Sequence, residues 1–172
     1  MGLFRSLRFF WDRDPPGQPL LALLGAYARD PLLWASWPFI RSHEPGARVS
    51  RQALETFMDT LEPDRLSAVT LTTLAQHING SWTQSGHLAG RAHKIRSRAV
   101  TSPGRVCLAL VLAHLSGLRG ALLFSSEFCQ VLDCSVDTLM SLAKDASRRG
   151  WITMKRIDPV VEVTFPQRLT AP

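Results

Sequence analysis

The sequence predicts a mainly α-helical protein built from helix-turn-helix modules, with two modules in tandem and a β-hairpin after the C-terminal one. Three observations lead to this fold class. Apolar residues recur at helical spacing along most of the chain, Ser or Asp residues that can cap a helix precede these stretches, and strand-like alternation appears only near the C-terminus. The composition, with 45% hydrophobic and 20% charged residues, is that of a globular protein.

Caps and breakers set the limits of the expected helices. Asp30-Pro31 and Ser102-Pro103 each place a proline in a first helical turn, and Gly86 stands where a helix ends in a left-handed residue. A short amphipathic helix is expected at residues 2–11. Further helices are expected at about residues 19–28, 31–41, 50–61, 67–85, 103–116, 125–132 and 135–149.

The longest expected helix, at residues 67–85, carries an apolar stripe. Leu71, Leu74, Ile78 and Trp82 recur at helical spacing, so they are expected to face a core. The helix that begins at residue 103 is apolar nearly all round and is therefore expected to be central and buried.

The end of the chain predicts a β-hairpin, because residues 151–157 and 160–165 alternate in and out around an Asp-Pro turn. From residue 103 onward the order is therefore helix, short helix, tight turn, capped helix and hairpin, which is the order of a winged-helix domain. Residues 50–100 permit the same interpretation, with a basic hairpin at 87–100. An all-helical bundle with one C-terminal wing is the alternative for this half.

These elements divide the chain into three parts. Residues 1–18 form an N-terminal arm, residues 19–101 form a helical or winged-helix domain with the basic hairpin, and residues 102–172 form a C-terminal winged-helix domain.

The net charge of +6 is concentrated in one part of the chain. Residues 65–126 contain seven basic side chains and no acidic one, and five of the seven lie between Arg91 and Arg105, with His87 and His93 beside them. A stretch without counter-charges favours a polyanionic partner over a solvated loop.

The first module has the better surface for reading DNA. Opposite the apolar stripe of residues 67–85 lie small, neutral hydrogen-bonding groups, of which Thr73, Gln76, Asn79 and Thr83 are expected to approach base edges or phosphates. The expected phosphate contacts are the cations that follow this helix, namely Arg91, Lys94, Arg96, Arg98 and Arg105.

The second module is the weaker candidate for DNA. Its capped helix exposes Asp137 and Asp145, whose carboxylates repel phosphate, so protein contact or dimerisation is expected there unless Lys144, Arg148 and the nearby cations gather on one edge.

Two phrases carry a resemblance to known families. The segment 146–152, Ala-Ser-Arg-Arg-Gly-Trp-Ile, resembles the junction between recognition helix and first wing strand in winged-helix DNA-binding proteins. The segment 81–88, Ser-Trp-Thr-Gln-Ser-Gly-His-Leu, stands before the basic stretch. With the size and order of elements, it resembles the small BrxA-type accessory protein of BREX phage-defence systems. This resemblance implies a compact helical protein with DNA-binding character, and no site residues are transferred from it.

Several other classes of protein are not expected. The longest apolar stretches are shorter than the roughly 20 residues that a bilayer requires, so no membrane partner is expected. Cys107, Cys129 and Cys134 match no disulfide or zinc spacing and are expected to be packed, reduced thiols in a cytoplasmic protein. No metal site, cofactor motif or catalytic arrangement is present in the pattern.

The function expected from the sequence is therefore non-catalytic binding of double-stranded DNA, by a regulator or an accessory subunit of a larger complex. RNA remains an alternative polymer, since an arginine-rich loop suits both. The competing class is a protein-interaction adaptor, in which the basic run docks on an acidic partner and Phe4, Phe10 and Trp11 fill its groove. A homo-oligomer is compatible with either function.

Overall fold

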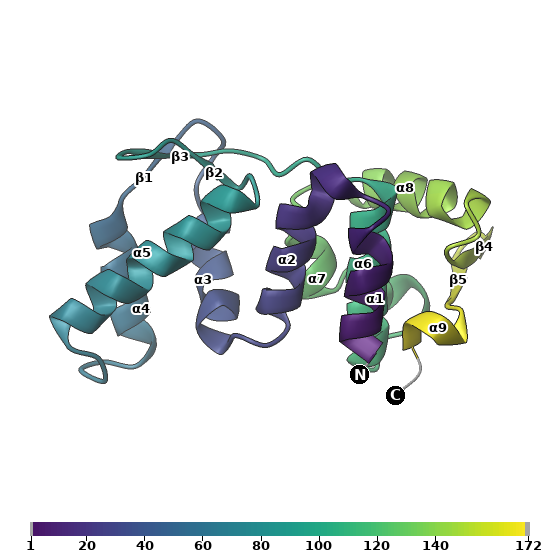
Figure 1. Cartoon of the computed structure of the whole chain (residues 1–172), viewed down its shortest axis with the longest axis horizontal. Helices are drawn as coiled ribbons and strands as arrows, with labels where there is room; N and C mark the ends of the chain where they lie inside the picture. The colour runs from purple at the N-terminus through teal and green to yellow at the C-terminus, as the bar shows by residue number, and fades with distance from the viewer. Residues whose placement is uncertain (1, 171–172) are drawn as a thin grey trace. The chain divides into compact units, whose positions relative to one another are not determined.

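The computed structural model describes residues 2–170 and is mainly helical, with two small antiparallel sheets (Figure 1), which confirms the mainly α fold. The chain forms two compact units. One contains the residues up to 28 together with those from 100 on, and the other contains residues 29–99. Among the described residues, none of the helices combines the length and the apolar character needed to cross a bilayer.

The unit of residues 29–99 alternates helices with short strands. Its elements in chain order are α3 (Pro31–Arg41), β1 (Arg48–Val49), α4 (Arg51–Leu61), α5 (Ala68–Gln84), β2 (Leu88–Ala89) and β3 (Lys94–Arg96). The three strands form one sheet in the order β1-β3-β2, and both pairings are antiparallel. The β2–β3 hairpin lies in the expected basic segment, whereas β1 lies between the helices expected at 31–41 and 50–61, where no strand was expected.

Two glycines make this hairpin possible. Gly86 has φ of +90° directly after Ser85, the C-cap of α5, so it is the left-handed helix end that the sequence predicts. Gly90 has φ of +92°, and a Cβ there would lie 2.2 Å from the carbonyl oxygen of His93. Only glycine accommodates both this positive φ and this close approach to the backbone, so Gly90 sets the tight turn between β2 and β3.

The core of the 29–99 unit forms around Trp82. This side chain is fully buried, stacks on Trp37 with ring centroids 5.3 Å apart, and donates a hydrogen bond from Nε1 to Ser36 Oγ at 2.9 Å. Ile78 is also buried, as the apolar stripe predicts. Leu71 and Leu74 belong to the same stripe but are only half-buried, so the expectation that all four residues face a core is wrong for its N-terminal half.

The other unit is assembled from both ends of the chain. Its α-helices are α1 (Gly2–Trp11), α2 (Gln18–Tyr27), α6 (Pro103–Leu115), α7 (Glu127–Gln130), α8 (Val136–Arg148) and α9 (Gln167–Thr170). Its strands are β4 (Thr153–Ile157) and β5 (Val160–Thr164), and two 3₁₀ turns, η1 (Pro15–Gly17) and η2 (Gly120–Leu123), connect helices. Helix α6 is buried along most of its length, as expected. Helix α7 is shorter than the segment 125–132, and α9 was not expected.

The N-terminal arm packs into this unit, so the structure places the domain boundaries differently from the sequence. Ser6 Oγ donates a 2.6 Å hydrogen bond to the carbonyl oxygen of Leu169, and the fully buried Phe10 meets the ring of Trp151 edge-on at 5.7 Å. Residues 19–28 belong to this unit as well. Long-range side-chain contacts decide this arrangement, and local sequence patterns do not report them.

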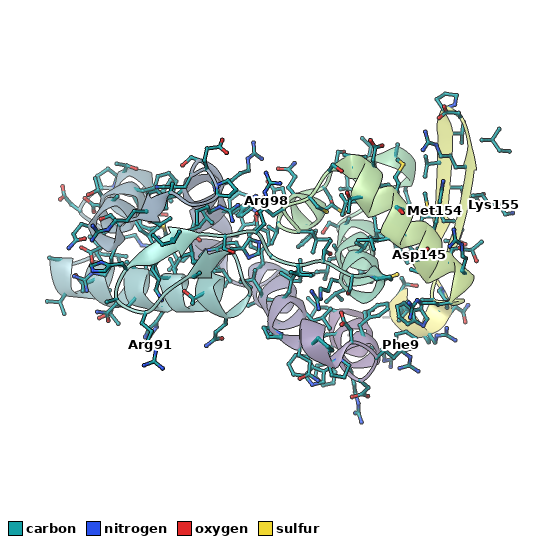
Figure 2. The ribbon with its side chains drawn as sticks, turned by 90° about the horizontal axis from the view of Figure 1, so that it is seen from above. Phe9, Arg91, Arg98, Asp145, Met154 and Lys155 are labelled. Carbon is teal, nitrogen blue, oxygen red and sulfur yellow. The ribbon has the colours of Figure 1, made fainter. Side chains whose placement is uncertain are left out.

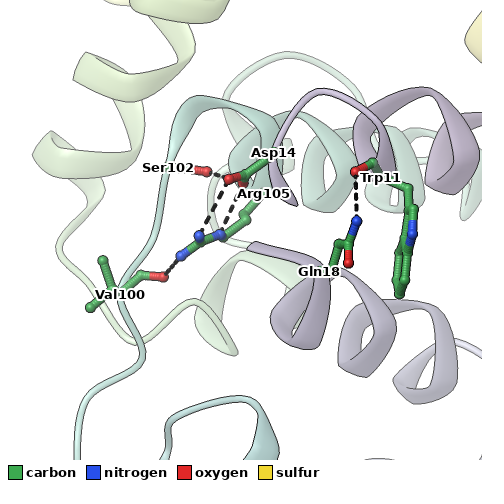
Figure 3. Close-up of polar contacts among 6 residues, drawn as sticks. All are labelled: Trp11, Asp14, Gln18, Val100, Ser102 and Arg105. Atoms are coloured by element: carbon green, nitrogen blue, oxygen red, sulfur yellow. Dashed lines mark hydrogen bonds and ion pairs between the residues drawn. The ribbon is translucent and has the colours of Figure 1, made fainter. Parts of the chain in front are cut away.

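An ion pair joins the arm to α6 (Figure 3). Arg105 Nε lies 3.0 Å from Asp14 Oδ2, and the two side chains are 8% and 13% exposed. Ser102 Oγ donates to the same carboxylate at 2.6 Å, and Arg105 also donates to the carbonyl oxygen of Val100. Arg105 was expected to contact DNA phosphate. That expectation is wrong, because the charge of Arg105 is buried and is neutralised by Asp14.

Replacing one partner of this buried pair is expected to destabilise the fold. Arg105→Ala leaves the Asp14 carboxylate without its cation in a poorly hydrated place, at a cost of about 3–5 kcal/mol in the free energy of unfolding. Denaturant unfolding followed by circular dichroism measures this cost. The control is Arg148→Ala, which breaks the exposed Arg148–Asp145 pair and should cost less than about 0.5 kcal/mol. Equal costs for the two variants would contradict the structural role of Arg105.

Candidate functional site

A concave pocket of about 480 Å³ lies on the 29–99 unit, where its hairpin meets two helices. Residues from β1, the start of α4, the middle of α5 and the β2–β3 turn all contribute to it. The pocket is lined by Arg48, Val49, Ser50, Arg51, Gln52, Gln76, Asn79, Gly80, Arg91, Ala92, His93 and Lys94. This set contains four cationic side chains and no carboxylate. We call this site the cationic pocket.

Strand pairing brings these cations together from distant parts of the chain. Val49 of β1 pairs with Lys94 of β3, which places Arg48 beside the hairpin turn. Arg48 Nη2 donates a 2.9 Å hydrogen bond to His93 Nδ1, so this ring nitrogen acts as the acceptor. Lys94 Nζ donates to the carbonyl oxygen of Gly90 at 2.7 Å, which steadies the ammonium group at the same turn.

Arg91 and Arg51 complete the positive lining. Arg91 is exposed at the tip of the hairpin, and its side chain extends away from the ribbon in Figure 2. Arg51 lies 3.0 Å from Glu55 one turn along α4, which fixes its guanidinium group while offsetting part of its charge. Ser50 caps α4 by accepting a hydrogen bond from the amide of Ala53, so the positive end of this helix dipole also faces the pocket.

Two features of α5 in the pocket have no explanation within the unit. Asn79 is 5% exposed, and its Oδ1 has no hydrogen-bond partner among the described residues. A buried polar atom without a partner is costly, so such atoms often mark a binding site. Gly80 follows directly, in the interior of the helix, and nothing lies within 4 Å of the position where a Cβ would be.

The structure brings together four of the nine DNA-contact residues expected from sequence. Gln76, Asn79, Arg91 and Lys94 all line the pocket. Gln76 is exposed, whereas Asn79 contributes only a small accessible surface.

Three further residues lie outside the pocket lining. Thr73 and Arg98 are exposed, and the Thr73 hydroxyl donates to the carbonyl oxygen of Val69 at 3.1 Å. Figure 2 shows Arg98 on the chain after the hairpin. Thr83 is half-buried, and its hydroxyl donates to the carbonyl oxygen of Asn79 at 2.6 Å.

Arg96 requires a correction, because it was expected to contact phosphate and is only 3% exposed. Its Nε donates to the carbonyl oxygen of Ile40 at 3.1 Å, and its Nη1 donates to those of His87 and Ser97. The guanidinium group also lies over the ring of Trp37, at 5.8 Å from its centre. Arg96 therefore holds the hairpin against α3 and the end of α5 from inside the unit.

His87 is also inside the fold. It is fully buried, hydrogen-bonded through Nδ1 to Ser85 at 2.8 Å, and lies edge-on to the rings of Trp37 and Trp82. Of the two histidines beside the basic run, only His93 lines the pocket.

Arg48, Arg51 and Gln52 are among the pocket residues that the sequence analysis missed. They lie in the part of the chain where acidic residues slightly outnumber basic ones, so local charge did not single them out. The sequence signal that could have identified the two arginines is their position, because they flank a Ser that caps a helix.

The other reactive side chains of the described residues are the cysteines and the groups that could bind a metal ion. No cluster of three or more metal-ligand side chains occurs within residues 2–170. Cys107 and Cys129 are buried, and burial raises the pKa of Cys129 to about 12 and also raises the pKa of Cys107. Both are therefore protonated, packed thiols, as expected, whereas Cys134 is half-buried.

Comparison with known proteins gives no match to this chain among family models, curated proteins or solved structures. A function can therefore be inferred only from the chemistry and geometry of the pocket.

The burial of Arg96 predicts that its loss affects stability more than the loss of a pocket cation. Arg96→Ala removes the guanidinium donor from three carbonyl groups, of which those of Ile40 and His87 keep a backbone N–H donor. It also opens a void beside Trp37, so it should lower the free energy of unfolding by at least about 2 kcal/mol. Arg91→Ala should change it by less than about 0.5 kcal/mol, because the side chain is exposed. Thermal unfolding followed by tryptophan fluorescence compares them. An Arg96→Ala variant as stable as the wild type would contradict the structural role.

Proposed function

We propose that the 29–99 unit is a winged-helix module that binds double-stranded DNA without catalysis. In support, its order of helix, strand, helix, helix and two strands, with the sheet order β1-β3-β2, is that of winged-helix domains. In this assignment α5 is the helix presented to the duplex and the β2–β3 hairpin is the wing. The protein acts as a regulator or as an accessory subunit of a larger complex, with phage defence as one setting.

The observation that carries the proposal is the charge of the pocket. Arg48, Arg51, Arg91 and Lys94 line one concave surface together with the hydrogen-bonding side chain of Gln76, and no carboxylate lines it. Guanidinium and ammonium groups bind phosphate oxygens, while an amide on the adjoining helix can hydrogen-bond to base edges. Since the cations flank the helix, phosphate contacts and base contacts are available on the same face.

The exposed face of α5 suits a polyanion for a second reason. The side chains that it exposes include no carboxylate over the full length of the helix, so none of them repels an approaching phosphate. The exposed residues of α5 include Val69, Thr70, Thr73, Gln76, His77 and Gln84.

Gly80 supports close approach of the ligand to this helix. A glycine in a helix interior costs about 1 kcal/mol relative to alanine, and here no neighbouring atom requires it, because the space above it is open. Its position in the pocket lining makes the lack of a side chain useful to a ligand, since the helix backbone can then approach a DNA strand closely.

The C-terminal part repeats the order of helix, short helix, helix and hairpin in α6, α7, α8 and the β4–β5 pair. Its α8 exposes Asp137, and Asp145 pairs with Arg148 on the surface. This mixed charge is less suited to phosphate, so we assign DNA binding to the 29–99 unit and protein contact to α8.

Removing two pocket cations is expected to lower the salt dependence of DNA binding. Each phosphate contact contributes about −0.9 to the slope of log affinity against log salt, so Arg91→Ala with Lys94→Ala should make the slope less negative by about 1.8. Gel-shift titrations of a duplex at several salt concentrations measure this slope.

The matched control removes two cations from α8, as Lys144→Ala with Arg148→Ala, and should leave the slope unchanged. If the wild-type protein binds no duplex at low salt, the proposed function is wrong. A stronger affinity for single-stranded RNA than for duplex DNA would transfer the same site to the other polymer.

Adding a methyl group at Gly80 is expected to separate stability from binding. Gly80→Ala should raise the free energy of unfolding by about 1 kcal/mol, because alanine favours the helix, and should weaken duplex binding, because it occupies the approach to the backbone. Ser81→Ala is the control, since it raises helix propensity one residue away without lining the pocket. Unchanged binding by Gly80→Ala would show that α5 does not approach DNA at this point.

A further inference from the structure

A second concave surface lies on the 29–99 unit, formed by the start of α3, the end of α4 and the first half of α5. Its volume is about 360 Å³, and most of its lining is apolar. We call it the leucine groove, and it is lined by Asp30, Pro31, Leu32, Ala35, Met58, Asp59, Leu61, Glu62, Arg65, Leu66, Leu71 and Leu74.

The leucine groove is an incomplete hydrophobic core. Leu71 and Leu74 continue the apolar stripe of α5 beyond the buried Ile78 and Trp82, yet the described residues of the unit cover them only in part. Leu61 on the facing helix is 46% exposed. Removing leucine side chains from water by contact with a further apolar surface is favourable, so this groove is suited to a partner.

The rim of the leucine groove is acidic. Asp30, Asp59 and Glu62 contribute three carboxylates, and the only cation of the lining, Arg65, is paired with Glu62. The occupant that fits this surface is therefore an amphipathic helix that carries apolar and basic residues on one face.

Helix α1 of the same chain presents such a face to solvent. Phe4 is 65% exposed and Trp11 is 37% exposed, and Arg8 lies between them on the same side because the three are spaced at i, i+4 and i+7. Arg5 is exposed as well, and α1 contains no acidic residue. Phe4 and Trp11 are about 10 Å apart along the helix axis.

The inward face of α1 is already occupied within its own unit. Phe10 is fully buried, so the adaptor hypothesis that Phe10 fills a partner's groove is wrong, whereas its assignment of Phe4 and Trp11 to a partner remains open. The outward face can bind a second surface without α1 leaving its place.

We infer that the leucine groove binds the outward face of α1 from a second copy of this chain. Phe4 and Trp11 would meet the leucines, and Arg5 and Arg8 would face Asp59 and the neighbouring carboxylates. The charge complementarity of two unpartnered surfaces on one chain identifies a second copy as the occupant. The leucine groove and the outward face of α1 are always present at equal concentration, because one chain carries both. The inference does not depend on DNA binding, since the leucine groove shares no lining residue with the cationic pocket.

Such a contact is heterologous, because each copy contributes its helix to one interface and its groove to another. This asymmetry allows a test by mixing two variants. Arg8→Glu spoils the helix and leaves the groove intact, and Asp59→Arg spoils the groove and leaves the helix intact. Each variant alone lacks one half of every contact, whereas a mixture of the two can still form one complete contact.

Sedimentation velocity of the full chain at low salt, over a range of concentrations, measures the outcome. The wild type should increase in mean mass with concentration, and raised salt should weaken this effect because the contact is partly electrostatic. Each single variant should associate at least about tenfold more weakly. An equimolar mixture should form complexes that contain both variants.

Two charge reversals on the β4–β5 hairpin serve as matched controls. Lys155→Glu and Glu162→Arg change the net charge by the same amounts as the test variants at exposed sites outside both surfaces, so they should associate as the wild type does. Circular dichroism confirms that each variant is folded. A wild type that stays monomeric throughout would overturn the inference, as would single variants that still associate or a mixture that forms no such complexes.

Discussion

The geometry of the cationic pocket depends on one buried arginine. Arg96 donates hydrogen bonds to carbonyl groups of α3, of the segment after α5 and of the residue that follows its own strand, and it lies over Trp37. These bonds hold the hairpin at a fixed place beside the helices. Since Arg91, His93 and Lys94 are carried by this hairpin, the position of the charges follows from an arginine that never reaches the surface. Arg96 thus acts on the proposed DNA contact through position and not through its own charge.

Arg105 shows the same principle in the other unit. Its charge is neutralised by Asp14, which comes from the opposite end of the sequence, and the pair joins the N-terminal arm to α6. Two of the five cations that a linear view assigns to phosphate are therefore structural. Burial of a charge requires a partner, and a basic run that contains both buried and exposed arginines cannot be divided between these roles without knowing the partners.

The two concave surfaces of the 29–99 unit differ in chemistry, and this difference separates their proposed roles. One combines arginine, lysine and amide groups and suits phosphate and base edges, while the other combines leucines with carboxylates and suits a basic amphipathic helix. Helix α5 contributes to both, with its polar middle in the pocket and its apolar beginning in the leucine groove. A regulator or accessory subunit that binds DNA through one surface and another copy through the other would place several modules along a duplex.

The sequence by itself determined helices α1 to α8 and the C-terminal hairpin, because caps, breakers and apolar periodicity act within a few residues of each other. It also singled out Gln76, Asn79, Arg91 and Lys94, four residues that line the cationic pocket, because they share a helix face or a charge run. Only the tertiary structure decided that Arg48 joins them, since the pairing of β1 with β3 links residues far apart in the chain. It alone buried Arg96 and Arg105 and left Leu71 and Leu74 partly uncovered, because burial depends on which distant segments pack together, and local periodicity carries no record of that.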